Sequence, residues 1–333
     1  MEIPLQTEIT SKENNPLPHA PINPKAFGYF AIVLLILAAI VIAFEYRAPS
    51  INAPAPAEIA ASVAASDAFE KLSISAKSAI VIDLTNGKTL FAHNPDAQLP
   101  LASLAKIPLA IVVSEVLPPD AILSIPQNTS PLGSAEHLGK GERWRVRDII
   151  DFTLVASSNG GADILAKAAD GPLRARYRDA PEGNAAIWRM NQLARELGLS
   201  RTYFLNASGL DESNTISGAY GSARDVANLF AYAEYSHPSI FSGTAESGLN
   251  LVSANGRGKT SAFNTNEALS DIPGLAMGKT GITDLAGGNL AIVFDVGLAH
   301  PVVIVVLGST REGRFEDMRL LVDKTRQAIA KHA

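Results

Sequence analysis

The sequence predicts an α+β fold, in which helices flank an antiparallel sheet and one transmembrane helix precedes the whole. Runs rich in Val, Ile and Leu occur near the start and the end of the chain, each interrupted by turn-forming residues. The segments between them carry apolar residues at helical spacing. A long uncharged run stands ahead of all these elements. We therefore expect the first and last strands to meet in one sheet that the helices cover.

Composition excludes several classes of function. The chain has 333 residues and is 47% hydrophobic, which is enough to bury a core and argues against general disorder. Its net charge of -5 argues against a dedicated nucleic-acid-binding protein, because such proteins need a basic surface. There are no cysteines, so disulfides, thiolate metal sites and a cysteine nucleophile are excluded.

The N-terminal region predicts a membrane anchor. Residues 26–44 carry no charge, and at about 1.5 Å per residue they can cross the ~30 Å hydrocarbon core of a bilayer. A cleaved signal peptide fits less well, because the preceding segment is long and acidic. Lys12 and Lys25 before the run, against Arg47 after it, favour a cytoplasmic N-terminus. We expect a cytoplasmic tail at 1–25 and a single-pass membrane anchor at 26–45 that holds the rest of the chain outside the cytoplasm.

A linker is predicted to join the anchor to one large domain. Residues 48–58 (APSINAPAPAE) are typical of a semi-rigid extended segment, and residues 59–72 have the apolar spacing of a short helix. We assign residues 46–72 to this linker and helix, and residues 73–333 to the large domain, in which the motifs described below lie.

Strands are predicted at both ends of this domain. Asn86-Gly87 lies between two apolar runs, which is the strongest short-range indication of a β-hairpin. A second pair of strands meets near the C-terminus, around residues 297–300. The four expected strands are Ala79–Leu84, Thr89–His93, Asn289–Val296 and Pro301–Leu307.

Helices are predicted between these strand pairs and at the end of the chain. Pro108 falls inside the first of them, so this helix should be kinked or begin late. The expected helices are Leu101–Val116, Arg147–Val155, Gly161–Ala169, Ala185–Leu197, Ala223–Ala233 and Phe315–Lys331.

The first chemical motif is Ser103-Leu104-Ala105-Lys106. Positions i and i+3 of a helix share a face, so the Ser103 hydroxyl and the Lys106 amine are expected to meet. Serine is a weak nucleophile until a base removes its proton, and a lysine whose pKa is lowered by burial can be that base. Taken alone, the pair is equally typical of a helix cap beside a surface lysine.

Two further motifs follow along the chain. In Ser157-Ser158-Asn159, a second hydroxyl can relay a proton and an amide can hold the lysine and the substrate. In Lys279-Thr280-Gly281, a cation and a hydroxyl on an edge strand can bind a carboxylate, and Gly281 permits close backbone approach. Each motif alone also fits an ordinary loop or turn.

The ordered set of three motifs is far more specific than any one of them, because it is typical of penicillin-binding proteins and class A β-lactamases. The sequence resembles the D-alanyl-D-alanine carboxypeptidases of the low-molecular-mass penicillin-binding type, within the serine β-lactamase-like superfamily. The likeness extends over residues 79–329. It includes IDLTNGKTLFAHNPDAQLPLASLAK, GKGERWRVRDIIDFTLVASSNGGAD, MNQLARELGLSRTYFLNASGLD, FNTN, GLAMGKTGITDLAGGNL and VLGSTREGRFEDMRLL.

The resemblance implies the reaction and its catalytic groups. The terminal D-Ala of a peptidoglycan stem peptide would be removed through an acyl-serine intermediate, as part of cell-wall biogenesis, and β-lactam antibiotics would be covalent inhibitors. Ser103 would be the nucleophile, Lys106 its base and Ser157 the proton relay. The oxyanion hole would be the backbone N–H groups of Ser103 and Ile282.

The resemblance also implies the residues that bind the substrate. Asn159 would clamp the substrate and the lysine, while Lys279, Thr280 and Gly281 would hold the terminal carboxylate. No metal and no cofactor is implied, and the six histidines, His137 and His237 among them, are scattered.

Departures from the family pattern bear on the rival functions. Ala105 stands where the family often has Thr, Gly160 where it often has Asp, and residues 170–185 are expected to form an extra loop. A D,D-endopeptidase acting on cross-links, a serine β-lactamase and a membrane-tethered sensor that is acylated once remain alternatives. Glu196 begins a near match to the Glu-x-x-Leu-Asn run with which class A β-lactamases activate water. We interpret it as structural, because Gly198 should end its helix and Ser200 replaces the Asn.

Overall fold

The computed structural model describes residues 67–125 and 138–331. Every described residue belongs to one compact unit, which includes residues up to Ala333. The expected tail, the anchor and most of the linker therefore lie outside the described residues. In the part of the chain that the structure describes, no helix is both long and apolar enough to cross a membrane.

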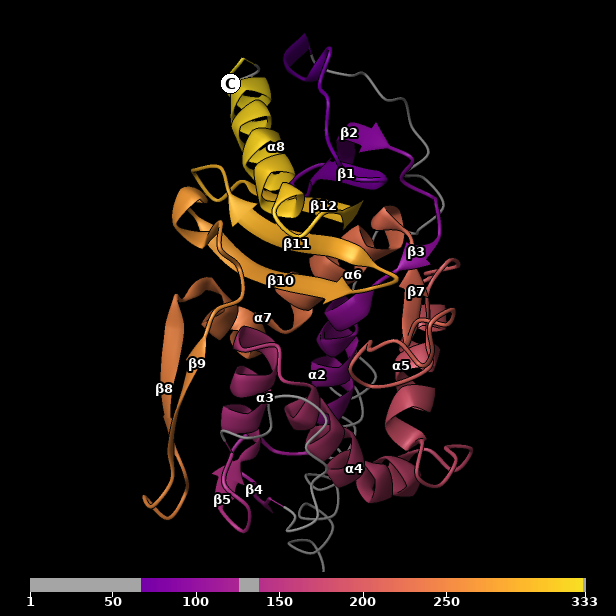
Figure 1. The fold of residues 1–333 in the computed structure, drawn as a ribbon, viewed down its shortest axis with the longest axis vertical. Helices are drawn as coiled ribbons and strands as arrows, with labels where there is room; N and C mark the ends of the chain where they lie inside the picture. The colour runs from indigo at the N-terminus through magenta and orange to yellow at the C-terminus, as the bar shows by residue number, and fades with distance from the viewer. Residues whose placement is uncertain (1–66, 126–137, 332–333) are drawn as a thin grey trace, which may run out of the picture. The chain divides into compact units, whose positions relative to one another are not determined.

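A five-stranded antiparallel sheet forms the centre of this unit, as predicted (Figure 1). Its order is β10-β11-β12-β1-β2, so the first strand of the domain pairs with the last. Ser78 lies opposite Leu307 in this pairing, and β10 is an edge strand. The strands are β1 (Ser78–Asp83), β2 (Lys88–His93), β10 (Leu275–Thr283), β11 (Gly287–Asp295) and β12 (Pro301–Ser309).

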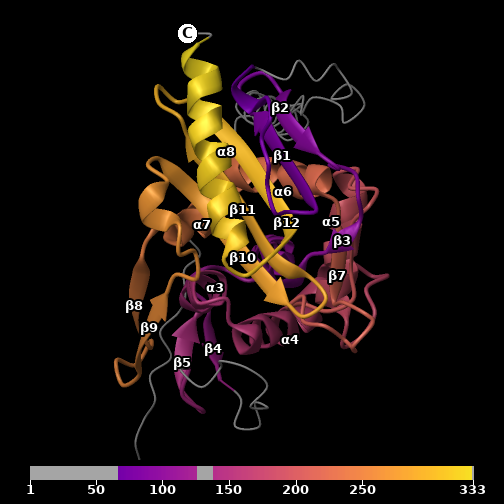
Figure 2. The same cartoon turned by 45° about the horizontal axis from the view of Figure 1, so that its top comes forward.

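Alternate residues of the strands enter two hydrophobic cores on opposite faces of the sheet. In β1, Ile80 and Ile82 belong to one core, whereas Ala79 and Val81 belong to the other, as the two-residue period of a strand requires. The α8 helix (Gly313–Ala330) covers one face with Phe315 and neighbouring residues, and α6 (Ala223–Ser236) covers the other (Figure 2). Burial on both faces explains why these strands are almost wholly apolar.

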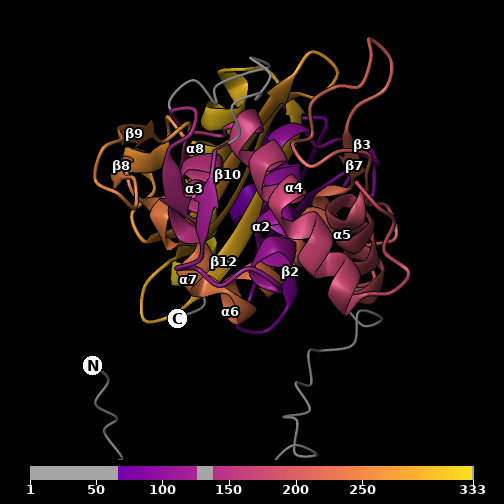
Figure 3. The same cartoon turned by 90° about the horizontal axis from the view of Figure 1, so that it is seen from below.

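The remaining helices pack together on the α6 side of the sheet, around the buried helix α2 (Figure 3). Every residue of α2 from Lys106 to Val113 is buried, so this helix is the core of the helical region. All the predicted helices of the domain are present. Besides α6 and α8, the helices are α2 (Lys106–Ser114), α3 (Val146–Val155), α4 (Asn159–Arg176), α5 (Ala185–Glu196) and the short α7 (Pro238–Phe241).

One proline lies near the start of α2 and another near the end of α4. The α2 helix begins only at Lys106, after the 3₁₀ turn η2 (Ala102–Ala105), so Pro108 falls in its first turn as a late start requires. The predicted extra loop over residues 170–185 is wrong in its first half, because α4 continues through Pro172 to Arg176. Leu173 is fully buried, and this packing maintains the helix past the missing proline N–H.

Three small sheets were not predicted. They lie outside the central sheet and consist of strands of two to five residues. They pair β3 (Leu99–Pro100) with β7 (Ala219–Gly221) and β6 (Tyr203–Phe204), β4 (Ile122–Ser124) with β5 (Arg143–Arg145), and β8 (Gly248–Val252) with β9 (Lys259–Phe263). Short 3₁₀ turns complete the unit: η1 (Asp67–Phe69), η4 (Ser242–Ala245) and η5 (Leu269–Asp271).

Candidate active site

Ser103 lies on the 3₁₀ turn η2, which neighbouring strands hold in place. The N–H of Leu101 donates to Ala219 O at 2.9 Å, and Asn289 Nδ2 donates to Pro100 O at 3.0 Å. Ala102 has a φ of 49°, in the left-handed region that non-glycine residues rarely adopt. A Cβ at Gly209 would collide with the Ala102 carbonyl, so glycine is needed there. The backbone that presents Ser103 is therefore fixed on several sides.

Lys106 lies beside Ser103, one 3₁₀ turn away, where side chains three residues apart are aligned. Its Nζ is 2.7 Å from Ser103 Oγ. The same nitrogen donates to Asn159 Oδ1 at 2.8 Å and to the carbonyl oxygen of Ser208 at 2.9 Å. The Lys106 side chain is fully buried. Burial, together with the positive charge of Lys279, holds the pKa of Lys106 well below its usual range.

The Ser157-Ser158-Asn159 motif forms the turn between α3 and α4. Ser158 is the N-cap of α4 and accepts from the N–H of Gly161, so Asn159 is the first residue of the helix and reaches Lys106. Ser157 has a φ of 57°. This strained turn aims the Ser157 hydroxyl toward β10, where Lys279 Nζ donates to it at 2.8 Å.

Lys279-Thr280-Gly281 lies on the edge strand β10, as predicted. Lys279 is buried, and its Nζ also donates to Thr280 O at 2.9 Å. Burial, with a smaller contribution from the Arg314 cation, lowers the pKa of Lys279 from 10.5 to about 7. Thr280 Oγ1 lies 2.6 Å from Thr265 Oγ1.

Gly281 is required for contact between β10 and the turn that bears the nucleophile. A Cβ at this position would lie 2.8 Å from Leu101 O and 3.2 Å from Ser103 N. Any side chain would therefore push η2 away from the strand. This close approach brings the Ser103 motif, at the start of the helical region, against the Lys279 motif on the central sheet.

These residues surround a pocket of about 220 Å³. It is lined by Ser103, Ser157, Thr280, Gly281 and Ile282 from the predicted set, and by Asn264, Thr265, Glu267, Arg311 and Arg314, which sequence reasoning did not single out. Arg314 is buried and donates to Gly281 O at 2.9 Å, which fixes the edge of β10. Four of these five residues, all but Glu267, lie in segments recognised as family-like, but no spacing rule marked them individually. Ser208 was also missed, because it acts through its backbone carbonyl.

The chemistry of the pocket rests on these side chains. No group of three or more His, Asp or Glu residues that could hold a metal ion occurs within residues 67–125 and 138–331. The pocket combines hydroxyl groups with two arginines and one carboxylate, Glu267, and the buried amine of Lys106 lies behind Ser103. Such a site can acylate a serine and attract an anionic substrate group.

Comparison with known proteins identifies the family. A model of the peptidase family described as D-alanyl-D-alanine carboxypeptidase matches residues 62–311. The chain belongs to this D-alanyl-D-alanine carboxypeptidase family. The predicted family is therefore confirmed, and the three motifs that indicated it lie around one pocket.

Relatives within the carboxypeptidase family carry two kinds of name. The D-alanyl-D-alanine carboxypeptidase DacF of Bacillus subtilis is 28% identical over 259 residues, which are 76% of this chain and 62% of that protein. A D-alanyl-D-alanine endopeptidase of Pseudomonas aeruginosa is 31% identical over 237 residues, 69% of this chain and 70% of that protein. The chain thus spans less than two thirds of the length of DacF.

Solved structures confirm the fold of this carboxypeptidase-family chain. Penicillin-binding protein D2 of Listeria monocytogenes, in its cefotaxime-bound form, superposes with a TM-score of 0.64 at 28% identity, covering 76% of this chain and 98% of that one. Its ampicillin-bound form gives a TM-score of 0.63 at 29% identity, with the same coverage. The α+β prediction of an antiparallel sheet flanked by helices is therefore correct.

Proposed function

We propose that the protein is a serine-type D-Ala-D-Ala carboxypeptidase that removes the terminal D-Ala of peptidoglycan stem peptides through an acyl-serine intermediate. The observation that carries this proposal is the hydrogen-bond geometry of Lys106. A neutral amine has two N–H donors and one lone pair. Asn159 Oδ1 and the Ser208 carbonyl can only accept, so they take both N–H groups. The lone pair is left for the third neighbour, the Ser103 hydroxyl, 2.7 Å away.

This arrangement supports acylation. Lys106 accepts the Ser103 proton as Oγ attacks the carbonyl carbon between the two D-Ala residues. The N–H groups of Ser103 and Ile282 are assigned to the oxyanion of the tetrahedral intermediate, since both residues line the same pocket. Ser157 then relays this proton from Lys106 to the leaving amine, so that its hydroxyl is restored and Lys106 returns to the neutral amine. Water hydrolyses the acyl-enzyme in the second half of the reaction.

The side of the pocket that β10 forms supports binding of the terminal carboxylate. Lys279 and Thr280 are assigned to it, and Arg311 and Arg314 add positive charge along the wall. Bringing a carboxylate to Lys279 favours the charged form of this lysine, whose pKa is about 7 in the free pocket. A free C-terminal carboxylate is the feature that distinguishes a carboxypeptidase substrate.

Endopeptidase activity is the second candidate, because relatives of comparable similarity in Pseudomonas aeruginosa and Escherichia coli are named D-alanyl-D-alanine endopeptidase. The same catalytic groups would serve both reactions. Mass analysis of the products from a stem pentapeptide and from a cross-linked dimer separates them. Release of D-Ala from the pentapeptide supports the main proposal, whereas cleavage of the dimer alone supports the endopeptidase.

The β-lactamase alternative has little support in the geometry. Glu196 ends α5, is 55% exposed and accepts from Arg189 Nη1 at 2.7 Å. The N–H of Leu199 donates to Ala194 O and that of Gly198 to Arg195 O, a Schellman motif with Gly198 at a φ of 69°. Among the described residues, those that line the catalytic pocket do not include Glu196. We therefore expect a stoichiometric burst with penicillin and then little turnover.

Labelling with a fluorescent penicillin tests the proposed function. The parent chain should be labelled once, and Ser103→Ala should lose both the label and D-Ala release. Ser114→Ala is the matched control, since this hydroxyl lies at the far end of α2 and donates to Ile111 O at 2.7 Å. Label retained by Ser103→Ala would exclude Ser103 as the nucleophile.

We also propose that residues 26–45 anchor the protein in the cell membrane, with residues 73–333 on the extracytoplasmic side. The supporting observations are the uncharged run and the distribution of Lys and Arg around it. This location gives the catalytic domain access to peptidoglycan.

A further inference from the structure

The β8–β9 hairpin begins at the catalytic pocket and extends away from it. Asn264 and Thr265, directly after β9, line that pocket, and Thr265 contacts Thr280. Thr280 is assigned above to the terminal carboxylate. The hairpin therefore starts on the leaving-group side of the scissile bond. It leads toward β4 and β5, at the end of the unit opposite α8 (Figure 1).

One face of this hairpin is open to solvent. In the strand register, Leu249 pairs with Ala262 and Leu251 with Thr260, and Leu251 and Ala262 are buried. The opposite face consists of Phe263, the pair Asn250 and Ser261, and the pair Val252 and Lys259. The Phe263 side chain is 77% exposed although it adjoins the catalytic pocket in sequence. Val252 on the same face is 44% exposed, so the face offers two exposed apolar side chains to a ligand.

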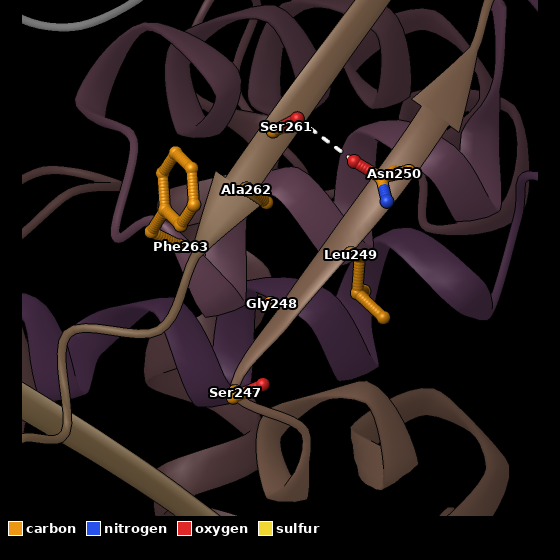
Figure 4. Close-up of a pocket in the computed structure, with 7 residues that line it drawn as sticks. All are labelled: Ser247, Gly248, Leu249, Asn250, Ser261, Ala262 and Phe263. Carbon is orange, nitrogen blue, oxygen red and sulfur yellow. Dashed lines mark hydrogen bonds between the residues drawn. The ribbon is translucent and has the colours of Figure 1, made fainter.

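A hollow of about 210 Å³ accompanies this face (Figure 4). It is lined by residues 247–250 and 261–263, and Ser261 Oγ donates to Asn250 Oδ1 across the strands at 2.8 Å. Hydroxyl and amide groups beside an exposed ring can bind the backbone of a peptide. From Phe263 to Lys259 the strand covers about 14 Å, which is the length of roughly four extended residues.

Four exposed cations gather where the hairpin ends. The N–H of Ala254 donates to Arg143 O at 2.6 Å, which fixes the hairpin tip against β5. Lys140, Arg143, Arg257 and Lys259 are exposed, and within the described chain none of them forms an ion pair. One carboxylate, Glu142, lies in the same region, where its Oε2 accepts from Gly139 N and Trp144 Nε1 and offsets one of the four positive charges. We call these four residues the basic cluster. It is a local exception on a chain of net charge -5.

We propose that the open face of the β8–β9 hairpin and the basic cluster bind the carboxylate-bearing stem peptide of a neighbouring peptidoglycan strand. This inference rests on the second candidate under the proposed function, cleavage of peptide cross-links at the same catalytic pocket. In a cross-link, the leaving amine belongs to a second stem peptide, which must lie on the leaving-group side of the pocket. Stem peptides carry free carboxylates, and a row of exposed cations attracts them. The hairpin thus holds the part of cross-linked substrate that a single stem pentapeptide lacks.

Binding to purified peptidoglycan sacculi tests the proposal. The full chain in detergent is used with Ser103→Ala, so that no turnover alters the wall material. The basic-cluster variant carries four substitutions, Lys140→Gln, Arg143→Gln, Arg257→Gln and Lys259→Gln. It should bind sacculi roughly tenfold more weakly at low salt, and its binding should depend less on salt. Phe263→Ser should also weaken binding, but with the salt dependence retained.

The matched control removes four exposed cations elsewhere: Lys77→Gln, Lys88→Gln, Arg178→Gln and Lys331→Gln. Equal binding of sacculi by the basic-cluster variant and this control would overturn the proposal. The proposal would also be overturned if the basic-cluster variant lost binding only to anionic phospholipid vesicles. Unchanged binding by Phe263→Ser would exclude the hairpin face. In chains that retain Ser103, penicillin labelling of the basic-cluster variant reports folding and tests the proposed function separately.

Discussion

Burial of two lysines beside the catalytic pocket, with a smaller contribution from neighbouring positive charges, favours the neutral form of the base. Arg314 lowers the pKa of Lys279, and Lys279 in turn lowers that of Lys106, in addition to the burial of both lysines. No carboxylate is among the contacts of Lys106 Nζ, which are a hydroxyl, an amide oxygen and a backbone carbonyl. The site therefore favours a neutral amine beside Ser103, which is the form a general base requires.

Replacement of Lys106 by arginine tests this role. Arginine keeps a positive charge and cannot accept a proton near neutral pH, so acylation by penicillin should slow by roughly 10²- to 10⁴-fold. Lys167→Arg is the control, since Lys167 is 73% exposed and pairs with Asp163 at 2.7 Å. The rate of penicillin labelling measures both variants. Near-normal acylation of Lys106→Arg would point to another base.

The pH profile tests the role of Lys279. Because its pKa is about 7, the free pocket loses this charge as the pH rises through that value. The value of kcat/KM for a stem pentapeptide should therefore fall above about pH 7, through a rise in KM. Lys279→Arg, which stays charged, should lose this limb of the profile. A descending limb that persists in the arginine variant would contradict the assignment.

The same lysine makes a contribution to stability with the opposite pH dependence. Its folded-state pKa of about 7 lies below the ordinary 10.5, so between these values the unfolded chain binds the extra proton. Stability then increases as the pH rises from about 7 toward 10.5. Activity and stability thus respond to Lys279 in opposite directions over this range.

Sequence reasoning identified the reacting side chains but not the groups that position them. Ser103, Lys106, Ser157, Asn159 and Lys279 belong to motifs with a chemical meaning, and the structure joins them by hydrogen bonds. Ser208 contributes only a carbonyl oxygen, which every residue possesses. Backbone roles of this kind leave no mark in a residue pattern, and only the fold reveals them.

At the scale of elements, the contact between η2 and β10 joins the nucleophile to the carboxylate side of the pocket. Gly281→Ala should destabilise the protein by about 1–3 kcal/mol and slow acylation, because its Cβ would press on Leu101 O and Ser103 N. Gly278→Ala on the same strand is the control, since a Cβ there meets its nearest neighbour at an ordinary 3.5 Å. Urea unfolding and penicillin labelling measure both effects. Equal behaviour of the two variants would contradict the close-contact argument.

The elements that could be predicted are helices of several turns and strands that form long apolar runs. The β11 and β12 strands and the α3, α5 and α6 helices matched their expected ranges to within a few residues. The β3 and β6 strands have two residues each, too few to display any period. They exist because their neighbours in space pair with them. The continuation of α4 through Pro172 is likewise a tertiary effect, since local propensity favours a break there.

At the scale of the whole molecule, both chain segments that flank the helical region return to one sheet. β1 and β12 are far apart in sequence and adjacent in space, so the catalytic groups carried by helices and by β10 are brought together only in the complete domain. Such non-local pairing predicts slow folding. It also explains why the three motifs, although far apart in sequence, form one pocket.

The proposed anchor makes a prediction about the whole chain in the cell. If residues 26–45 span the membrane with the N-terminus in the cytoplasm, the catalytic domain must lie outside. Protease added to spheroplasts should then digest the catalytic domain, while a cytoplasmic marker protein stays intact until detergent is added. The chain should also sediment with membranes at high salt, because an apolar span is held by hydrophobic burial and not by charge. Full protection of the domain, or a mature N-terminus located after Phe44, would contradict the anchor in this orientation.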